Sequence, residues 1–559
     1  MCITYYNTIL FAYLQYGDDH VYGYLPETCD EKRGNDKDMF LSWWNHTERK
    51  EKFIQILVFF LIFGASLDLK GPVFGTPMSL AGLYIIYDCI KKRRLAGFYL
   101  PIRYWLGLAV FLGTVVLASL LLGDRPSIGI ALKNVSWCLP FIVVTYLGKQ
   151  ADIKYAALLG AMASVLVSSA DLLYLTQYLG TKGRVGAFGK NANHYALLLL
   201  GVLPVVFAAF QDRSIRALKK IYFLQCIVAV LGMWSLWKTG SRGAMIGFLA
   251  GGLFVFGVIC FYRKRFKQFL TGFTICFAVA AFVLLAGVPG GEMRNDAARL
   301  RMLRSSYAMW QDHTLTGVGL ANWQKEYTTT YLLKGEIEAE ALQGYQAWKK
   351  AAEQRAAAAR KAAEAKKAAA AKKAAEQKKT APPKASETKA TTPKPKPQLT
   401  AAQKAEAARK AAAAQKAATQ KAAAAKKAAA EREAKQIAAW KQAAIKHETT
   451  KFAMPHNVAA WFFSTTGSIG GFGYLFFVCC YSWVFCKEMK RSDIAWIDAV
   501  GFWAFLAIAI HGMVDAGIIY KAVARLLYLV MGLSISYYCL ADRRRIPKEG
   551  DGSTHSGRD

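Results

Sequence analysis

Apolar stretches long enough to cross a bilayer recur along the chain, and most are separated by short polar connections. A hydrocarbon core about 30 Å thick requires about 20 residues of α-helix. The pattern predicts about twelve membrane-spanning helices, at roughly residues 53–68, 74–91, 101–122, 128–147, 154–174, 192–211, 219–237, 243–262, 267–287, 458–486, 494–513 and 521–540. The predicted fold class is an all-α polytopic membrane protein in which one loop is much longer than the others.

Lysine and arginine gather in alternate connections, which sets the expected orientation. Short loops rich in these residues remain on the cytoplasmic side of a membrane. With the N-terminus inside, all the basic connections fall on one face: Lys91–Arg94, Lys149–Lys154, Arg213–Lys220, Arg263–Lys267, Lys487–Arg491 and Arg543–Lys548. The sequence therefore predicts that both ends of the chain are cytoplasmic and that the long loop lies outside.

The domain organisation follows from this topology. The predicted segments are a cytoplasmic or interfacial N-terminal segment, spans one to nine, a folded part of the outer loop, a low-complexity arm, the loop's end with the last three spans, and a cytoplasmic tail. They cover residues 1–50, 51–287, 288–348, 349–446, 447–541 and 542–559. None of the eleven cysteines lies in the segments placed outside, which argues against an outer domain held together by disulfides.

The arm at 349–446 consists largely of alanine and lysine. It holds 26 Lys and Arg against 7 Asp and Glu, and so supplies +19 of the chain's net charge of +34. Both residue types favour helix, and a proline-containing break interrupts the pattern, with Pro382, Pro383, Pro393, Pro395 and Pro397. The arm lacks a Leu/Ile/Val stripe that could form a core, so we expect long solvated helices, with Trp348, Ile437 and Trp440 at their base.

Two interpretations of the arm remain open at this point. The simpler one is a solvated spacer. The other is a polycation that binds anionic glycolipid, cell wall or acidic glycan. Nucleic acid is not an expected partner, because the arm faces outward and has no interleaved aromatic residues.

Four ionisable residues stand out on the predicted outer face. Arg184 follows the fifth span, Arg242 begins the eighth, Arg299 follows the ninth, and His456 precedes the tenth. Charged side chains at membrane depth are costly unless they are paired, and they often mark functional sites. Each arginine could instead extend to the outer headgroups. Because three arginines and one histidine return to the same face from separate spans, we expect them to form one site.

These residue types suit the chemistry of a lipid-linked diphosphate. Arginine binds phosphate oxygens bidentately and neutralises a leaving diphosphate. His456 would act as a base, because imidazole titrates near neutral pH, and Asn457 would orient it or cap the next helix. The outer stretches contain no DxD pair and no His/Cys cluster at metal-ligand spacing. The sequence therefore predicts a mechanism without metal or other cofactor.

Several other residues are weaker candidates for supporting roles. Asn193 lies in the same stretch as Arg184, and His313 follows the basic stretch that contains Arg299. His511 and Asp515 lie one helical turn apart near the outer end of the eleventh span. That spacing predicts either a buried hydrogen bond between them that supports the site or an ordinary structural contact.

Four stretches resemble the O-antigen ligase and O-antigen polymerase superfamily of bacterial surface-polysaccharide enzymes. They are GRVGAFGKNANHYA (183–196), WKTGSRGAMIGFLAG (237–251), RLRMLRSSYAMWQDHTLTGVGLANW (299–323) and HNVAAWFFSTTGSIGGFGYLFF (456–477). The likeness covers most of the spans but neither residues 1–50 nor the arm. The chain departs from the family pattern at Thr314 and Ala192, where the family usually has proline.

The resemblance implies a GT-C-like glycosyltransferase in the bacterial inner membrane that acts at its periplasmic face in lipopolysaccharide biosynthesis. The donor would be a glycan on undecaprenyl diphosphate, and the acceptor a sugar hydroxyl of lipid A–core. Arg184 and Arg299 would hold the diphosphate, Arg242 would shape the same pocket, and His456 would activate the acceptor. Arg299 and His456 would thus be the catalytic pair.

Three alternatives remain open from the sequence. A repeat-unit polymerase of the same superfamily shares the motifs and differs only in its acceptor, which is another lipid-linked repeat unit. An anion transporter would use the arginines as a selectivity lining, although the spans show no charged trail. A membrane scaffold whose arm binds the cell wall leaves the outward arginines unexplained.

Overall fold

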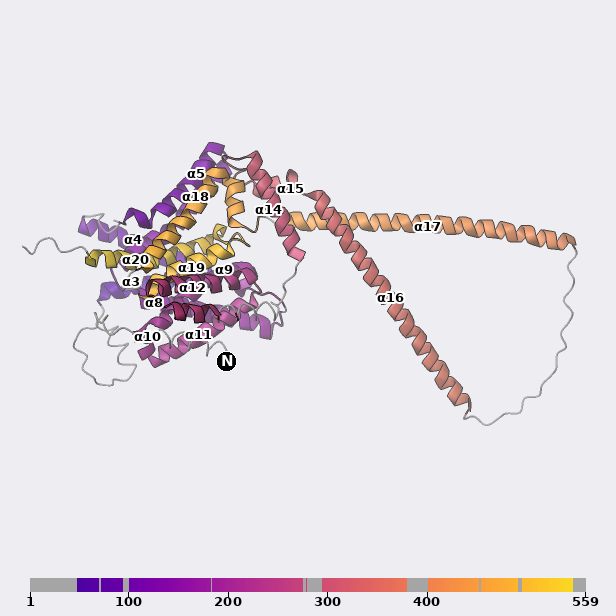
Figure 1. The fold of residues 1–559 in the computed structure, drawn as a ribbon, viewed down its shortest axis with the longest axis horizontal. Helices are drawn as coiled ribbons and strands as arrows, with labels where there is room; N and C mark the ends of the chain where they lie inside the picture. Colours follow the sequence, from indigo (N-terminus) through magenta and orange to yellow (C-terminus); the bar gives the residue numbers. More distant parts are fainter. Residues whose placement is uncertain are drawn as a thin grey trace, which may run out of the picture. The chain divides into compact units, whose positions relative to one another are not determined.

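The computed structural model describes residues 48–69, 72–93, 100–181, 183–274, 278, 294–379, 401–451, 454–490 and 495–545. Every regular element within these ranges is a helix (Figure 1). Most of the predicted ninth span, nearly all of the N-terminal segment, the proline-containing break of the arm and the tail beyond residue 545 lie outside the described residues. The chain divides into two units, Met1–Tyr331 with Met454–Asp559, and Leu332–Ala453.

The first unit consists of helices that follow the predicted spans closely. Its main elements are α3 (Arg49–Leu67), α4 (Pro72–Lys92), α5 (Leu106–Leu122), α6 (Arg125–Trp137), α7 (Leu139–Gly148), α8 (Lys154–Leu173), α9 (Ala192–Ala208), α10 (Arg213–Ala217), α11 (Lys219–Lys238), α12 (Arg242–Tyr262), α14 (Arg294–Asp312), α15 (Trp323–Thr329), α18 (Val458–Met489), α19 (Trp496–His511) and α20 (Lys521–Arg545). The predicted fourth span is two helices, α6 and α7, which meet at Cys138.

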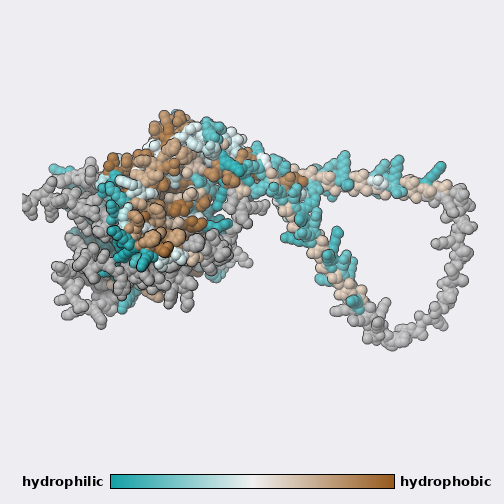
Figure 2. Space-filling view, in the orientation of Figure 1, coloured by the Kyte–Doolittle hydropathy of each residue, from teal (hydrophilic) through white to brown (hydrophobic). Residues whose placement is uncertain are grey.

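Eight helical segments of the described residues are long and apolar enough to cross a membrane, and α5 and α19 are shorter apolar helices. In the space-filling view, strongly hydrophobic residues spread over the surface of the helices in this unit (Figure 2). Exposed large apolar side chains such as Leu83, Ile90 and Leu121 suit contact with lipid rather than water. The chain is an all-α polytopic membrane protein.

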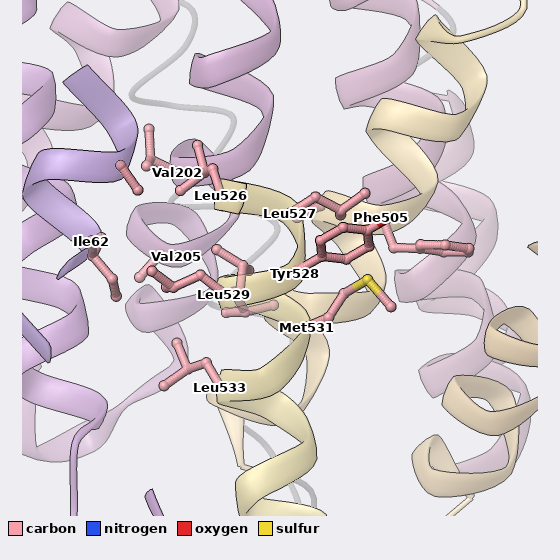
Figure 3. Packing of buried hydrophobic residues seen from close by; sticks show 14 of the residues in the cluster. Ile62, Val202, Val205, Phe505, Leu526, Leu527, Tyr528, Leu529, Met531 and Leu533 are labelled. Carbon is pink, nitrogen blue, oxygen red and sulfur yellow. The ribbon is translucent and has the colours of Figure 1, made fainter. Parts of the chain in front are cut away.

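Helix α20 lies at the centre of the core. Its Leu526 and Leu533 are fully buried, and they pack with Ile62 of α3, Val202 of α9 and other side chains from these helices (Figure 3). On its other side, Leu527 and Tyr528 lie near Phe505 of α19 (Figure 3). This packing holds the outer ends of α9, α19 and α20, which carry parts of the candidate site.

Small residues allow the closest helix contacts. A Cβ added at Gly247 of α12 would lie 2.5 Å from the carbonyl oxygen of Ala507 on α19. Such close approach is a common basis of helix association in membranes, where lipid is as apolar as the helix surface. It brings the start of α12, with Arg242, beside the end of α19, with His511.

The second unit consists of two long helices, α16 (Lys334–Lys379) and α17 (Ala401–Lys451) (Figure 1). α16 begins before the predicted arm boundary at residue 349 and runs through it without interruption. The helices contact each other through ion pairs that join Lys349 to Glu433 and Lys441 to Glu338. The ring centroids of Trp348 and Trp440 lie 5.8 Å apart at the same level.

Candidate active site

Arg184 is held between the start of α9 and the residues before α12. Its Nε donates a 3.0 Å hydrogen bond to the carbonyl oxygen of Thr239. Its terminal nitrogen donates to the side-chain oxygen of Asn193. Asn191, the N-cap of α9, accepts a hydrogen bond from the Asn193 backbone N–H and so fixes this turn. The predicted supporting residue Asn193 therefore lies in contact with Arg184.

Arg242 is the first residue of α12, and the residue before it connects the helix to α19. Ser241 caps α12, and its Oγ also lies 3.2 Å from Nε2 of the buried His511. A Cβ added at Gly243 would come within 2.4 Å of the Val514 side chain. Glycine at this position therefore lets the start of α12 pack directly against the segment that follows α19.

His456 lies at the start of α18, where three hydrogen bonds fix the backbone around it. Asn457 is the N-cap of α18 and accepts from the Ala460 N–H at 2.8 Å. Its amide donates to the carbonyl oxygen of Met513, and the Val458 N–H donates to that of Gly512. The start of α18 is thereby attached to the turn between α19 and α20.

The attachment places His456 beside Asp515. Nδ1 of His456 lies 3.1 Å from a carboxylate oxygen of Asp515, whose side chain is only 3% exposed, against 21% for the histidine. For His511 and Asp515 the sequence left open a supporting hydrogen bond or an ordinary structural contact. The Asp515 carboxylate contacts His456 and the His511 ring contacts Ser241, while the Asp515 N–H donates to the His511 carbonyl oxygen at 3.0 Å, which is an ordinary structural contact.

The charges of the site act on one another. Burial would raise the pKa of the Asp515 carboxyl, but the hydrogen bond from His456 and the positive charge of Arg299 hold that pKa below its usual value. Burial lowers the pKa of Arg184, and the nearby charges of Arg299 and Arg242 lower it further, while Asp515 opposes them. Three arginines and one carboxylate from four separate segments therefore lie within electrostatic range of one another.

Arg299 is supplied by α14, whose end is anchored to α18. The indole nitrogen of Trp310 donates to Oγ of Ser468, and the ring of Trp310 packs on Phe463 with centroids 5.1 Å apart. Beyond α14, the indole of Trp323 is buried and donates to Oγ of Ser306. These contacts hold α14 against the outer part of α18.

The glycine-containing loop after α14 pairs with a break in α18. Gly467 has φ 60° and ψ −160°, so α18 is two helical pieces rather than the continuous span that the sequence predicted. The freed carbonyls of Ser464 and Thr465 accept hydrogen bonds from the N–H groups of Val318 and Gly319, both at 2.9 Å. The Ser468 N–H donates in turn to the carbonyl oxygen of Thr314 at 2.7 Å. The loop thus satisfies backbone groups that would otherwise be unpaired at membrane depth.

His313, another predicted supporting residue, is exposed at the end of α14, and its described contacts connect it to neighbouring backbone rather than to His456. Sequence reasoning missed a second polar cluster at this end of the unit. Asp68, after α3, lies 3.7 Å from both Lys190 and His194, and the ring of His194 stacks on Tyr520. The stretch KNANH carried a signal for this cluster, but its partner Asp68 is remote in the sequence.

The described residues offer an apolar pocket but no metal site. Among the described residues, no group of three or more His, Cys, Asp or Glu side chains is arranged to hold a metal ion. A pocket of about 500 Å³ lies along α12 between Ala250 and Tyr262. Its lining is apolar and includes none of the predicted site residues.

Comparison with known proteins assigns the central part of the chain. Residues 227–347 match the sequence model of a family described as O-antigen ligase. The likeness to this family rests on these residues. The match supports the O-antigen ligase and polymerase superfamily, and it agrees with the resemblance seen in the sequence. No curated protein matches the chain.

The matched residues include Arg242, Arg299 and His313. Arg184, His456 and Asp515 lie outside them, and the fold brings these three residues within electrostatic range of Arg299. Members of this family are glycosyltransferase-like enzymes that act on lipid-linked glycans at a membrane. The family and the apolar helices together indicate a multi-pass bacterial membrane protein.

Proposed function

We propose that this protein is an O-antigen ligase-type glycosyltransferase that moves a glycan from undecaprenyl diphosphate to a sugar hydroxyl of lipid A–core. The observation that carries the proposal is the His456–Asp515 pair beside Arg184, Arg242 and Arg299 in a chain that matches the O-antigen ligase family over residues 227–347. The basic connections on the opposite face support a reaction on the periplasmic side of the inner membrane.

In the proposed reaction, His456 is the general base. The acceptor hydroxyl oxygen attacks the anomeric carbon of the donor sugar, and the bond from that carbon to the diphosphate oxygen breaks. The hydroxyl proton passes to Nε2 of His456. Asp515 contacts Nδ1, which fixes the tautomer and stabilises the imidazolium that forms.

The arginines would stabilise the negative charge of the leaving group. As the sugar–diphosphate bond breaks, negative charge accumulates on the leaving undecaprenyl diphosphate. Arg299 and Arg184 would bind its non-bridging oxygens, and Arg242 would complete the pocket. The charges of Arg299 and Arg242 act unfavourably on that of Arg184, and a bound diphosphate would relieve this repulsion. The arginines perform this task in the proposed mechanism without a metal ion.

The proposal is tested by His456→Ala in the native host, with surface glycan and carrier-linked precursor measured together. The matched control is His313→Ala, because His313 lies in the same outer region but is exposed and outside the cluster. We expect loss of mature glycan with long chains accumulating on the carrier in His456→Ala, and a normal pattern in His313→Ala.

Two other outcomes contradict parts of the proposal. Accumulation of single repeat units would identify the protein as a polymerase that uses the same site. Unchanged glycan and precursor pools, with the variant inserted and abundant, would show that His456 has no role in transfer.

A further inference from the structure

The outer parts of α16 and α17 form an exposed and strongly basic surface. Every residue in 353–372 and 408–432 whose side chain is described is exposed. Three acidic residues occur in these segments, Glu353, Glu364 and Glu431. The basic residues are Arg355, Arg360, Lys361, Lys366, Lys367 and Lys372 in α16, and Arg409, Lys410, Lys416, Lys421, Lys426, Lys427 and Arg432 in α17. We call these two segments the basic arms.

The positive charge lies on all sides of each basic arm. In α16, basic pairs begin at Arg360 and Lys366, and Lys372 follows after another six residues. A helix turns about 100° per residue, so each six-residue step rotates the charge by about 240°. These three positions therefore point in three different directions, and the residues between them are mostly alanine.

This distribution disfavours a flat membrane as the partner. A helix that lies on a bilayer has a broad apolar face with Leu, Phe or Trp on one side and cations on the other. The basic arms have neither a large apolar residue nor a single charged face. A planar headgroup surface would contact only part of the charge, whereas a flexible chain can follow it around the helix.

The base of the two helices shows how the basic arms differ from the rest of the second unit. Lys349 and Lys441 are neutralised by Glu433 and Glu338, and Tyr345 donates a hydrogen bond to Gln436. At the base, charge is thus balanced within the protein and aromatic rings form the contact. Beyond the base the cations greatly outnumber the acids, so they must be balanced by solution ions or by a ligand.

We propose that the basic arms bind an acidic polysaccharide, a flexible chain with repeated carboxylate or phosphate groups. The proposal deepens the proposed function and rests on it, because it makes this acidic glycan the polymer that the enzyme transfers. Both arms are joined by the chain to the segments that carry Arg299 and His456. A glycan held by the arms would thus have a raised effective concentration near the carrier-linked end. Release of condensed counterions drives such binding and makes it salt-dependent.

The test measures binding of labelled polygalacturonate to the full-length protein in nanodiscs of neutral phosphatidylcholine. One variant is Lys366→Gln/Lys367→Gln/Lys372→Gln. The matched control removes the same charge elsewhere, with Lys219→Gln/Lys220→Gln/Lys264→Gln, three exposed lysines of the first unit, at the start of α11 and after α12. We expect the first variant to weaken binding about tenfold and to reduce its salt dependence. The control should bind as wild type does.

Binding is measured without turnover and repeated in His456→Ala, so it is independent of catalysis. Wild-type affinity in His456→Ala together with weaker binding in the arm variant supports binding of acidic glycan by the arms. Failure of the separate transfer test would overturn only the identification of that glycan as the transferred polymer. The inference is overturned by equal binding of neutral dextran, by unchanged affinity in the arm variant, or by binding only to vesicles containing phosphatidylglycerol.

Discussion

Asp515 is the residue that gives the candidate site its electrostatic balance. A buried carboxylate is destabilising unless cations and hydrogen bonds compensate for its lost hydration. Here His456 supplies the hydrogen bond, and Arg299 and Arg184 lie within range of the charge. The carboxylate in turn reduces the repulsion among the arginines.

The sequence predicted the members of this site better than their pairing. His456 and the arginines were identified because charge is costly near the membrane. The partner of Asp515 was not predictable, because helical spacing indicates only neighbours on one helix, such as His511. The observed contact joins the start of α18 to the turn after α19, across 59 residues of sequence. Such a contact depends on how the helices pack.

The depressed pKa of Asp515 predicts a specific pH dependence. A carboxyl whose folded pKa lies below its unfolded value of about 3.9 stabilises the fold above that pH, and the stabilisation is lost as the pH falls further. We expect Asp515→Asn to be less stable than wild type by about 1–3 kcal/mol at pH 7. The difference should shrink below about pH 4.

Thermal unfolding of the two proteins in detergent, from pH 7 to pH 3, measures this difference. A gap in melting temperature that stays constant throughout the range would show that the Asp515 charge contributes nothing to the fold.

At the scale of single elements, the break in α18 is the main departure from a simple span. Hydropathy predicted one continuous helix, because the residues on both sides of Gly467 are apolar or small. The break forms because the loop after α14 supplies replacement hydrogen bonds to Ser464 and Thr465. Glycines in the stretch TGVGLANW and in TTGSIGG were visible in the sequence, but nothing local indicated that the two stretches pair.

A substitution at Gly317 tests how much the pairing of the loop after α14 with the break in α18 contributes to stability. Its φ is +67°, and an added Cβ would lie 2.4 Å from the carbonyl carbon of Thr465. We expect Gly317→Ala to destabilise the protein by about 2 kcal/mol or more, through backbone strain and the clash. Gly129→Ala is the matched control, because Gly129 is helical and a Cβ there meets nothing within 4 Å. Melting temperatures that fall equally in both variants would argue against a structural role for the loop.

At the scale of the whole molecule, the hydropathy pattern predicted the fold class, and the Ala/Lys composition predicted the long helices of the arm. Apolar length alone identifies spanning helices, because a helix satisfies all of its backbone groups within one segment inside lipid. Trp348 and Trp440, two of the few large residues among the alanines and lysines, predicted where the two helices of the arm contact each other. The sequence does not show which helices are neighbours. That depends on close contacts such as the one between Gly247 and Ala507, which follow no repeating pattern along the sequence.

The two units are expected to be independent in stability. Replacing residues 353–432 with a short Gly–Ser linker retains the contact between Trp348 and Trp440 and removes only the exposed parts of the helices and the segment between them. Since no core is lost, we expect normal membrane insertion and a melting temperature within about 2 °C of wild type. Failure of the shortened protein to insert, measured by membrane fractionation, would show that the arm is needed for the fold.

The central claim is that His456 and Arg299 act together in glycan transfer, and the most direct test is transfer by the purified protein. Wild type, His456→Ala and Arg299→Ala would be supplied with a polyprenyl-diphosphate-linked glycan and a lipid A–core acceptor, with and without EDTA. The account predicts ligated product and released carrier diphosphate only for wild type, at a rate that EDTA does not change, while each variant loses about 100-fold or more. Transfer by His456→Ala at the wild-type rate would contradict the account.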